Sequence, residues 1–242
     1  MGATFVIGDT HGGLLALEEI LEKINLVATD RLIFLGDYVD GWSQSYQLLE
    51  YLIKLNKTYD CIFIKGNHDN WTHSWLKNEE PNAVWLHHGG RSTMDSYPSL
   101  DFIARKRHLA FFETMLDFYI DSEERLFIHA GFTSLRGPLF EIDLNTLLWD
   151  RTLWELALAV DPRIPRESRR YPMRLSLFKE IFIGHTPTTY LGSSIPMRAS
   201  NVWNLDTGAA FQGKLSAMNI ETKEVWQSTA LVYLYPNEKG RN

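Results

Sequence analysis

The segment Thr4-Phe5-Val6-Ile7-Gly8-Asp9-Thr10-His11 joins a short apolar run to two side chains that can bind a metal. Apolar, β-branched and aromatic runs of this length, punctuated by glycine, are typical of buried strands. Four further runs end in the same way, at Asp37, Asn67-His68-Asp69, His129 and His185. Because ligands in α/β folds collect at the carboxyl ends of strands, we expect these side chains to converge on one metal-centred active site.

The order of the predicted elements in the first half indicates an α/β fold. A strand over 4–8 precedes an amphipathic helix over 13–25, and a strand over 31–36 precedes a helix over 43–55. A third strand follows over 60–65. Two consecutive βαβ units predict parallel strands with helices covering a face of the sheet.

The second half is less regular. After a short helix near 70–77, the turn residues of 79–98 predict a loop, and a helix is expected over 100–115. The final third predicts short strands over 202–205, 214–220, 224–226 and 231–235, with a hairpin connection at 219–224. We expect these strands to be antiparallel and to form a second sheet packed on the first.

Composition favours one fairly large globular domain spanning residues 1–242. The apolar fraction is 45%, and the only cysteine, Cys61, lies in an apolar run that predicts a core position. A single cysteine excludes an internal disulfide and favours a reducing compartment. No apolar stretch approaches the roughly 20 residues that span a bilayer, which predicts a cytoplasmic protein without a membrane partner. The net charge of −6 argues against nucleic-acid binding.

The candidate ligands form a mixed oxygen and nitrogen set of aspartates, histidines and one asparagine amide. Such a set suits manganese, and also iron or zinc, whereas the absence of thiolates argues against a structural zinc site. There are too many candidates for one ion. Two divalent ions that share Asp37 as a bridging carboxylate would use them all, and two ions about 3.5–4 Å apart can clamp a phosphoryl group.

Five motifs, in order, resemble those of calcineurin-like metallophosphoesterases, and in particular bacterial members of the phosphoprotein phosphatase family. They are Gly8-Asp9-Thr10-His11-Gly12, Gly36-Asp37-Tyr38-Val39-Asp40-Gly41, Gly66-Asn67-His68-Asp69, His129-Ala130-Gly131 and Gly184-His185. The resemblance implies an α/β/β/α fold, in which two mixed β-sheets pack as a sandwich flanked by helices. The segment from Trp85 to Tyr97 also resembles a tryptophan- and glycine-containing segment of bacterial relatives.

The resemblance also implies a role for each motif residue. Asp9 and His11 would bind the first metal, and Asp37 would bridge. The second metal would be completed by Asn67, His129 and His185. His68 would be the general acid that protonates the leaving oxygen, oriented by the catalytic partner Asp40. Asp69 has two open interpretations, since it could cap the following helix or hold the loop.

The chain departs from the family pattern at Gly41, where the family usually has an arginine that grips the substrate phosphate. The clamp is therefore missing or supplied from elsewhere. We consider Arg151 a candidate, because Trp149-Asp150-Arg151 resembles a bacterial and phage segment whose arginine contacts phosphate. Arg91, beside the glycine pair Gly89-Gly90, is a second candidate.

The first functional hypothesis is a phosphomonoesterase that resembles serine/threonine protein phosphatases and works by in-line attack of a metal-bridging hydroxide. The alternative is a symmetrical dinucleoside tetraphosphate hydrolase or another nucleotide phosphatase. The partner would accordingly be a phosphorylated protein or a small phosphate ester or nucleotide. A third reading, a non-catalytic scaffold that binds phosphoproteins, is disfavoured because a scaffold has no need of a general acid.

Several residues near the motifs allow two interpretations. Trp42, Trp71 and Trp75 either line a substrate cleft or, more commonly, pack helices onto the sheet. Asp206 either orients a ligand or forms a turn. The remaining histidines match no family ligand position and are expected at the surface or in loops: His73, His87, His88 and His108.

Overall fold

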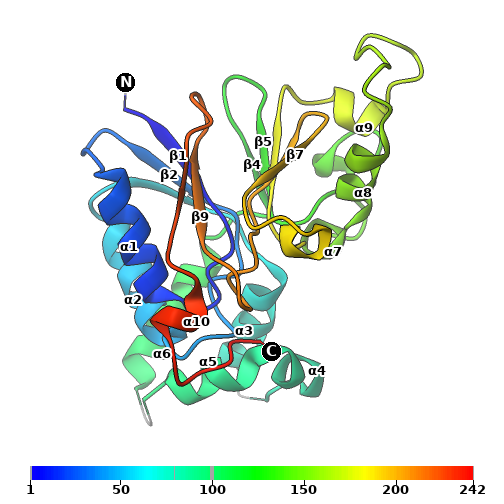
Figure 1. The fold of residues 1–242 in the computed structure, drawn as a ribbon. Helices are drawn as coiled ribbons and strands as arrows, with labels where there is room; N and C mark the ends of the chain where they lie inside the picture. Colours follow the sequence, from blue (N-terminus) through cyan, green and yellow to red (C-terminus); the bar gives the residue numbers. More distant parts are fainter. Residues whose placement is uncertain (1, 79, 99–100, 242) are drawn as a thin grey trace.

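The computed structural model describes residues 2–78, 80–98 and 101–241, and these residues form two five-stranded sheets that face each other. Helices cover the outer faces, so that the layers run helix, sheet, sheet, helix (Figure 1). This arrangement confirms the fold class that the motifs imply. Residues from both sheets meet in one apolar layer between them, which includes Val6, Ile33, Phe127 and Phe182.

The first sheet has the order β10-β9-β1-β2-β3. Its parallel strands are β1 (Thr4–Ile7), β2 (Arg31–Phe34) and β3 (Asp60–Phe63), as the βαβ pattern predicts. Strand β9 (Ser216–Asn219) runs antiparallel to β1, and β10 (Val225–Gln227) runs antiparallel to β9. The parallel strands therefore bring the first three motifs to one edge of this sheet.

The second sheet has the order β4-β5-β6-β8-β7. Its strands are β4 (Phe118–Ile120), β5 (Leu126–Ile128), β6 (Ile181–Ile183), β7 (Met197–Ala199) and β8 (Val202–Asn204). Strands β5, β6 and β8 are parallel, whereas the two edge strands are antiparallel to their neighbours. The late histidine motifs follow β5 and β6, side by side.

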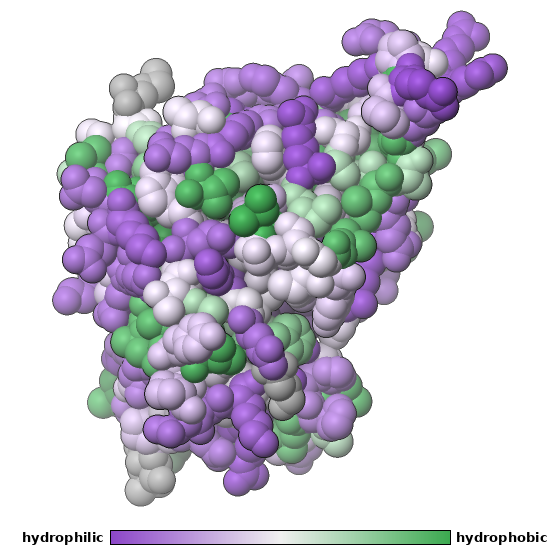
Figure 2. Space-filling model, in the orientation of Figure 1, coloured by the Kyte–Doolittle hydropathy of each residue, from purple (hydrophilic) through white to green (hydrophobic). Residues whose placement is uncertain are grey.

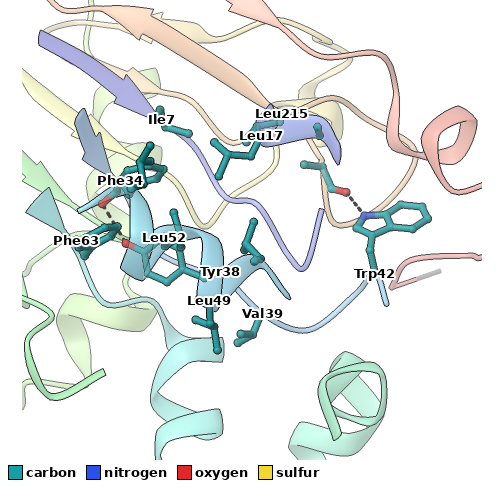
Figure 3. Packing of buried hydrophobic residues seen from close by; sticks show 14 of the residues in the cluster. Ile7, Leu17, Phe34, Tyr38, Val39, Trp42, Leu49, Leu52, Phe63 and Leu215 are labelled. Atoms are coloured by element: carbon teal, nitrogen blue, oxygen red, sulfur yellow. Dashed lines mark hydrogen bonds between the residues drawn. The ribbon is translucent and has the colours of Figure 1, made fainter. Parts of the chain in front are cut away.

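Helices α1 (Leu14–Ile24) and α2 (Ser45–Leu55) cover the outer face of the first sheet. Successive side chains of β1 point to opposite faces of the sheet. Phe5 and Ile7 therefore contact these helices, while Val6 points to the other sheet. Figure 3 shows Ile7 and the helix residue Leu17 among the tightly packed side chains of this core.

Further helices complete the layers. On the side of the first sheet lie α3 (Asn67–Asn78), α6 (Phe102–Glu113) and α10 (Leu231–Leu234). The second sheet is covered by α7 (Thr146–Trp149), α8 (Thr152–Ala159) and α9 (Met173–Ser176). Short 3₁₀ turns occur at η2 (Pro138–Phe140) and η3 (Thr188–Leu191).

The prediction of a loop over 79–98 is wrong for most of these residues. Residue 79 lies outside the part of the chain that the structure describes. The chain forms α4 (Ala83–Trp85), a π-helical turn η1 (Leu86–Gly90) and α5 (Arg91–Ser96). The glycine pair does not end the helix but only kinks it, with Gly89 at φ +101°. Trp85 is 0% exposed, and its burial stabilises the helical segment although the glycines and other turn-forming residues within it disfavour a helix.

Two expectations for the final third are also corrected. Residues 231–235 form α10 and a following turn instead of a strand, because Leu231 packs under α1 as part of the helix-covered core. The hairpin at 219–224 is confirmed, but its strands extend the first sheet beside β1 instead of building the second. The start of the helix predicted over 100–115 lies outside the described residues, and α6 begins at Phe102.

Polar and charged side chains cover much of the face seen in Figure 2, including the hydrophilic extension at its upper right formed by residues 160–172. Within the described part of the chain, none of the helices has the length and apolar character needed to cross a bilayer. Cys61 is half-buried against the first core, and burial raises the pKa of its thiol to about 12. The apolar context predicts a core position, and the structure places this unreactive thiol at the edge of the core.

We expect Phe127→Ala to lower the free energy of unfolding by about 3–5 kcal/mol. The Phe127 ring is fully buried between the sheets and stacks on Phe182 with ring centroids 4.9 Å apart. Urea denaturation measures the loss. Phe102→Ala is the matched control, because Phe102 is 60% exposed and its removal should change the stability by less than about 0.5 kcal/mol. A loss below about 1 kcal/mol for Phe127→Ala would contradict the packed inter-sheet layer.

Candidate active site

The loops that follow β1, β2, β3, β5 and β6 bring six predicted metal ligands to one point at the strand ends. Each of these residues is at most 8% exposed: Asp9, His11, Asp37, Asn67, His129 and His185. They are spread in the sequence from residue 9 to residue 185 and follow strands of both sheets. The convergence that the strand-end pattern predicts is therefore present in the fold.

Asp37 lies between two groups of potential metal ligands. One group consists of His11, Asp37 and His68, and the other of Asp37, His129 and His185, each with ligand atoms within 4.8 Å of one another. The same oxygen, Asp37 Oδ2, is 3.6 Å from His11 Nε2 and 3.4 Å from His129 Nε2. This shared position is the one that a bridging carboxylate needs.

Asn67 joins the second group through its amide oxygen. Its Oδ1 atom lies 3.1 Å from His129 Nε2 and 3.0 Å from His185 Nδ1. Asp9 approaches the first group, with Oδ2 4.0 Å from His11 Nε2. The two groups together offer carboxylate, amide and imidazole ligands, a set that suits first-row divalent ions.

Backbone carbonyl groups orient two of the imidazoles. His11 Nδ1 donates to the carbonyl oxygen of Asp40 at 2.8 Å, and His129 Nδ1 donates to that of Leu35 at 2.8 Å. With Nδ1 held by a carbonyl oxygen, Nε2 of each ring faces the centre. This is the usual arrangement around metal-binding histidines.

Two buried polar atoms at the centre have no hydrogen-bond partner among the described residues. They are Asp9 Oδ1 and His185 Nε2. A buried polar group without a partner is costly, and each exception calls for a ligand that satisfies it. Together with the carboxylate, amide and imidazole donors of the two groups, these unpartnered atoms fit a site for divalent cations.

The electrostatics of the centre are dominated by burial and by Asp37. Burial raises the pKa of Asp9 well above its usual range, and the nearby carboxylate of Asp206 adds to the effect. For Asp37 burial is outweighed, because the charges of His129 and His68 hold its pKa well below the usual range. The pKa of His129 rises to about 10 against the effect of burial, because Asp37 stabilises its cation.

Strained backbone accompanies the cluster. His11, Asp37, Asp40 and His185 have φ angles of 47°, 53°, 68° and 65°, in the left-handed region that side chains rarely adopt. Such strain persists where surrounding contacts impose it, and it gathers at functional sites.

Two motif glycines allow the close approach of the carboxylates. A Cβ atom at Gly66 would lie 2.1 Å from Asp37 Oδ1, and one at Gly184 would lie 2.0 Å from Asp9 Oδ1. No side chain fits at either position without displacing a candidate ligand. The glycines that precede Asn67 and His185 are therefore required by the site.

Asp69 holds the loops in place. Its carboxylate accepts hydrogen bonds from the backbone N–H groups of Asp37, Tyr38 and Gly66, at 2.7, 2.9 and 2.8 Å. The three bonds tie the loop after β2 to the loop after β3. Of the two roles that the sequence left open for Asp69, the structure shows loop fixation.

His68 and Asp40 form a buried pair next to the cluster. His68 Nδ1 lies 2.7 Å from Asp40 Oδ2, the same oxygen that accepts a bond from Trp85 Nε1 at 2.6 Å. Thr93 Oγ1 donates to the other oxygen, Oδ1, at 2.6 Å. The helical segment that was predicted to be a loop therefore orients Asp40. Its similarity to bacterial relatives was the only sequence signal of this role.

Burial controls the protonation of this pair. It raises the pKa of Asp40 to about 8, against the hydrogen bonds from Thr93 and Trp85, and it lowers the pKa of His68 to about 3. Both pKa shifts disfavour a charged Asp40 carboxylate facing a charged His68 imidazolium. The pair is held in a net-neutral state, and His68 Nε2 remains available on the side away from Asp40.

A small cavity of about 90 Å³ opens beside Asp37 and His68. Aromatic rings form one wall: Trp71 stacks on His88 with centroids 6.0 Å apart and meets Trp149 edge-on at 5.0 Å. Of the three tryptophans near the motifs, Trp71 thus lines the cavity. Trp42 and Trp75 are buried in the first core.

The candidate phosphate-binding residues lie in different places. Arg151 lines the cavity, whereas Arg91 binds Asp95 at the surface with 73% of its side chain exposed and does not line it. Arg241 also lines the cavity, although no sequence pattern singled it out.

The structure sorts the remaining polar candidates. His88 lines the cavity, whereas His108, which was expected at the surface or in a loop, is buried in α6 and bonded to Tyr97 and Glu50. Asp206 accepts the Gly208 N–H at 2.9 Å, which supports the turn interpretation, and its charge raises the pKa of Asp9.

We expect Asp69→Asn to weaken metal binding by about 10–100-fold, because an amide cannot accept all three backbone N–H groups that fix Asp37. Titration with Mn²⁺, followed by calorimetry, measures the change. Asp95→Asn removes an exposed carboxylate of the same type outside the site and should leave the affinity unchanged. Equal affinity of Asp69→Asn and wild type would contradict the role of Asp69 in loop fixation.

Comparisons with known proteins agree with this geometry. Residues 3–210 match the family model for calcineurin-like phosphoesterases. A bis(5'-nucleosyl)-tetraphosphatase PrpE (asymmetrical) from Oceanobacillus iheyensis is 26% identical, over 90% of this chain and 89% of the relative. The corresponding protein of Bacillus thuringiensis is 25% identical, over 90% and 91%.

Solved structures share the fold. A putative diadenosine tetraphosphatase superposes with a TM-score of 0.61 at 17% identity, covering 93% of this chain and 92% of that one. A serine/threonine phosphatase from Saccharomyces cerevisiae gives 0.57 at 16% identity, covering 95% and 80%. The family match over most of the sequence is decisive: this chain belongs to the calcineurin-like phosphoesterase family.

Proposed function

We propose that this protein is a two-metal hydrolase of dinucleoside tetraphosphates or related nucleotides. The observation that carries the proposal is the pair of ligand groups that share Asp37 beside a buried imidazole–carboxylate pair. Curated relatives that align over about 90% of both chains are named as bis(5'-nucleosyl)-tetraphosphatases, which supports this substrate class.

The proposed metal ligands follow the two groups. Asp9 and His11 would hold one ion, with Asp37 shared, and the second ion would be held by Asn67, His129 and His185. Manganese suits this mixed set, as do iron and zinc. When bound, two such ions lower the pKa of water to near neutrality and neutralise charge on the phosphoryl oxygens.

His68 is the proposed general acid. Its Nδ1 faces Asp40, so that Nε2–H can hand a proton to the leaving oxygen at the cavity while Nδ1 takes up the proton of the Asp40 carboxyl group. Asp40 fixes the orientation of the ring, and the bonds from Trp85 and Thr93 fix Asp40 in turn. A positioned acid of this kind contributes about 10²–10⁴-fold to a rate.

The aromatic wall favours a nucleotide. Trp71, His88 and Trp149 line the cavity within reach of the candidate metal ligands, and Trp149 is 42% exposed. Flat rings at the mouth of a phosphate site can stack on a base. An extended phosphate chain could then run from this wall to Asp37.

A phosphate monoester, such as a phosphorylated protein side chain, is the second candidate substrate. The observation in its favour is the His68–Asp40 pair itself. A serine or threonine alkoxide is a poor leaving group and depends on a proton donor, whereas a phosphate leaving group depends on it much less. A buried, well-oriented acid is therefore of most use to a monoesterase.

Parallel assays with the manganese-loaded protein separate the two candidates. We expect a higher kcat/KM for diadenosine tetraphosphate than for an aryl phosphate or a phosphoserine peptide, because only the dinucleotide combines a base that can stack on the aromatic wall with an extended phosphate chain. A preference for the phosphopeptide would favour the monoesterase instead. If none of the three substrates turns over with metal bound, both enzymatic proposals are wrong.

His68→Ala should lower kcat by about 10²–10⁴-fold on an alkyl phosphate and by much less on 4-nitrophenyl phosphate, whose leaving group needs no proton. Steady-state kinetics on the two esters measure the difference. His73→Ala is the matched control from the same helix, and it should retain both activities because His73 packs near Glu113, away from the cavity. An equal loss on both esters would contradict a general-acid role.

A further inference from the structure

The side chain of Arg241 enters the cavity from the C-terminal segment. It lines the cavity together with Arg151 and His185, and it also borders a smaller one of about 40 Å³ beside His11 and Asp206. Its Nε atom is buried and has no hydrogen-bond partner among the described residues. An arginine with a buried, unused donor at the edge of a phosphate site is available to bind an anion.

The stem of Arg241 occupies the space next to Gly41. A Cβ atom at Gly41 would lie 3.5 Å from Arg241 Cγ and 3.0 Å from the carbonyl oxygen of His11, and one at Gly89 would lie 3.2 Å from the same Cγ. Gly41 also has a φ of +142°, which side chains rarely adopt. A side chain at the position where the family usually has an arginine would thus be strained, and the stem of Arg241 lies beside it.

Contacts with residues 42 and 43 hold the C-terminal segment at this place. Tyr235 stacks on Trp42 with ring centroids 5.1 Å apart, and Glu238 accepts hydrogen bonds from Ser43 N and Oγ at 2.9 and 2.6 Å. The backbone N–H of Arg241 donates to Ala210 at 2.8 Å. In Figure 1 this segment, drawn in red, reaches the region of α4 and α5.

The loop that holds the C-terminal segment also contains Gly41, the position at which the motif lacks its arginine. Trp42 follows Gly41 directly, is fully buried, and donates its Nε1 hydrogen to the Ala209 carbonyl at 2.7 Å (Figure 3). The guanidinium carbon of Arg241 lies 5.3 Å from the ring centre of Phe211. The backbone and stem of Arg241 are therefore fixed before any substrate binds.

We propose that Arg241 binds the substrate phosphate and replaces the arginine that the motif lacks at Gly41. The inference rests on the proposed function, since it deepens the same site. A guanidinium can donate two parallel hydrogen bonds to a phosphate, which a lysine cannot. Arg241 and Arg151 both line the two cavities, so that together they can grip one phosphoryl group.

The charge of Arg241 already acts on the catalytic groups. Burial is the main cause of the low pKa of His11 and of His68, both about 3, and the positive charge of Arg241 lowers both further. The same charge works against the rise in the pKa of Asp40 that burial causes. The lining of the two cavities places Arg241 beside His68 in one and beside His11 in the other.

The test is the binding of inorganic phosphate to the manganese-loaded full chain, measured by calorimetry. We expect Arg241→Ala to weaken phosphate binding by about 10–100-fold, because hydrogen bonds to a charged group are lost. Arg241→Lys keeps the positive charge but loses the two parallel N–H donors. Its affinity for phosphate should therefore lie between those of Arg241→Ala and wild type. Arg136→Ala, an exposed arginine that lies over Phe140, is the control and should bind as wild type does.

The possible results separate a failure of the Arg241 proposal from a failure of the proposed function. Phosphate affinity of Arg241→Ala within twofold of wild type, at equal metal content, overturns the proposal. If the alanine variant does not fold, the lysine variant decides by the same comparison. A wild-type protein that binds phosphate but hydrolyses no ester or anhydride contradicts the proposed function alone, because the difference in binding between the variants still tests Arg241.

Discussion

The Asp37 carboxylate is the group on which the rest of the site depends. It lies between two sets of ligands that come from both sheets, and it is held there by a left-handed backbone and by the bonds from Asp69 to its loop. It approaches Gly66 so closely that a Cβ atom at residue 66 would collide with it. In a buried cluster of imidazoles and carboxylates, this one anion balances the charges, and it is also where two cations would meet.

The centre of the site could be predicted from the sequence, because its geometry is encoded locally. Each ligand follows directly on a short apolar run, and parallel strands necessarily end at a common edge. The hydrogen bonds that orient the Asp40 carboxylate could not be predicted in the same way. Trp85 and Thr93 lie in a helical segment whose glycines suggested a loop, and only burial of Trp85 against the first core makes it helical.

Long-range pairing explains the other errors. Strand β9 carries the same short apolar pattern whichever sheet it joins, and only its register with β1 decides between them. Arg241 is similar: the missing arginine at Gly41 revealed a gap, but nothing near residue 241 pointed to it. The contacts of Tyr235 with Trp42 and of Glu238 with Ser43 join segments that are almost 200 residues apart in the chain. In the proposed mode of binding, substrate is held by a metal cluster whose ligands come from both sheets and by Arg241 of the C-terminal segment.

The central claim is that Asp37 is shared by two metal ions, and metal counting tests it most directly. Protein loaded with Mn²⁺, freed of excess ion and analysed by mass spectrometry of the elements should hold two ions per chain. Asp37→Asn should lose at least one of them, because an amide is a weak bridging ligand. A wild-type chain that retains at most one ion, or an Asp37→Asn variant that retains both, would contradict the account.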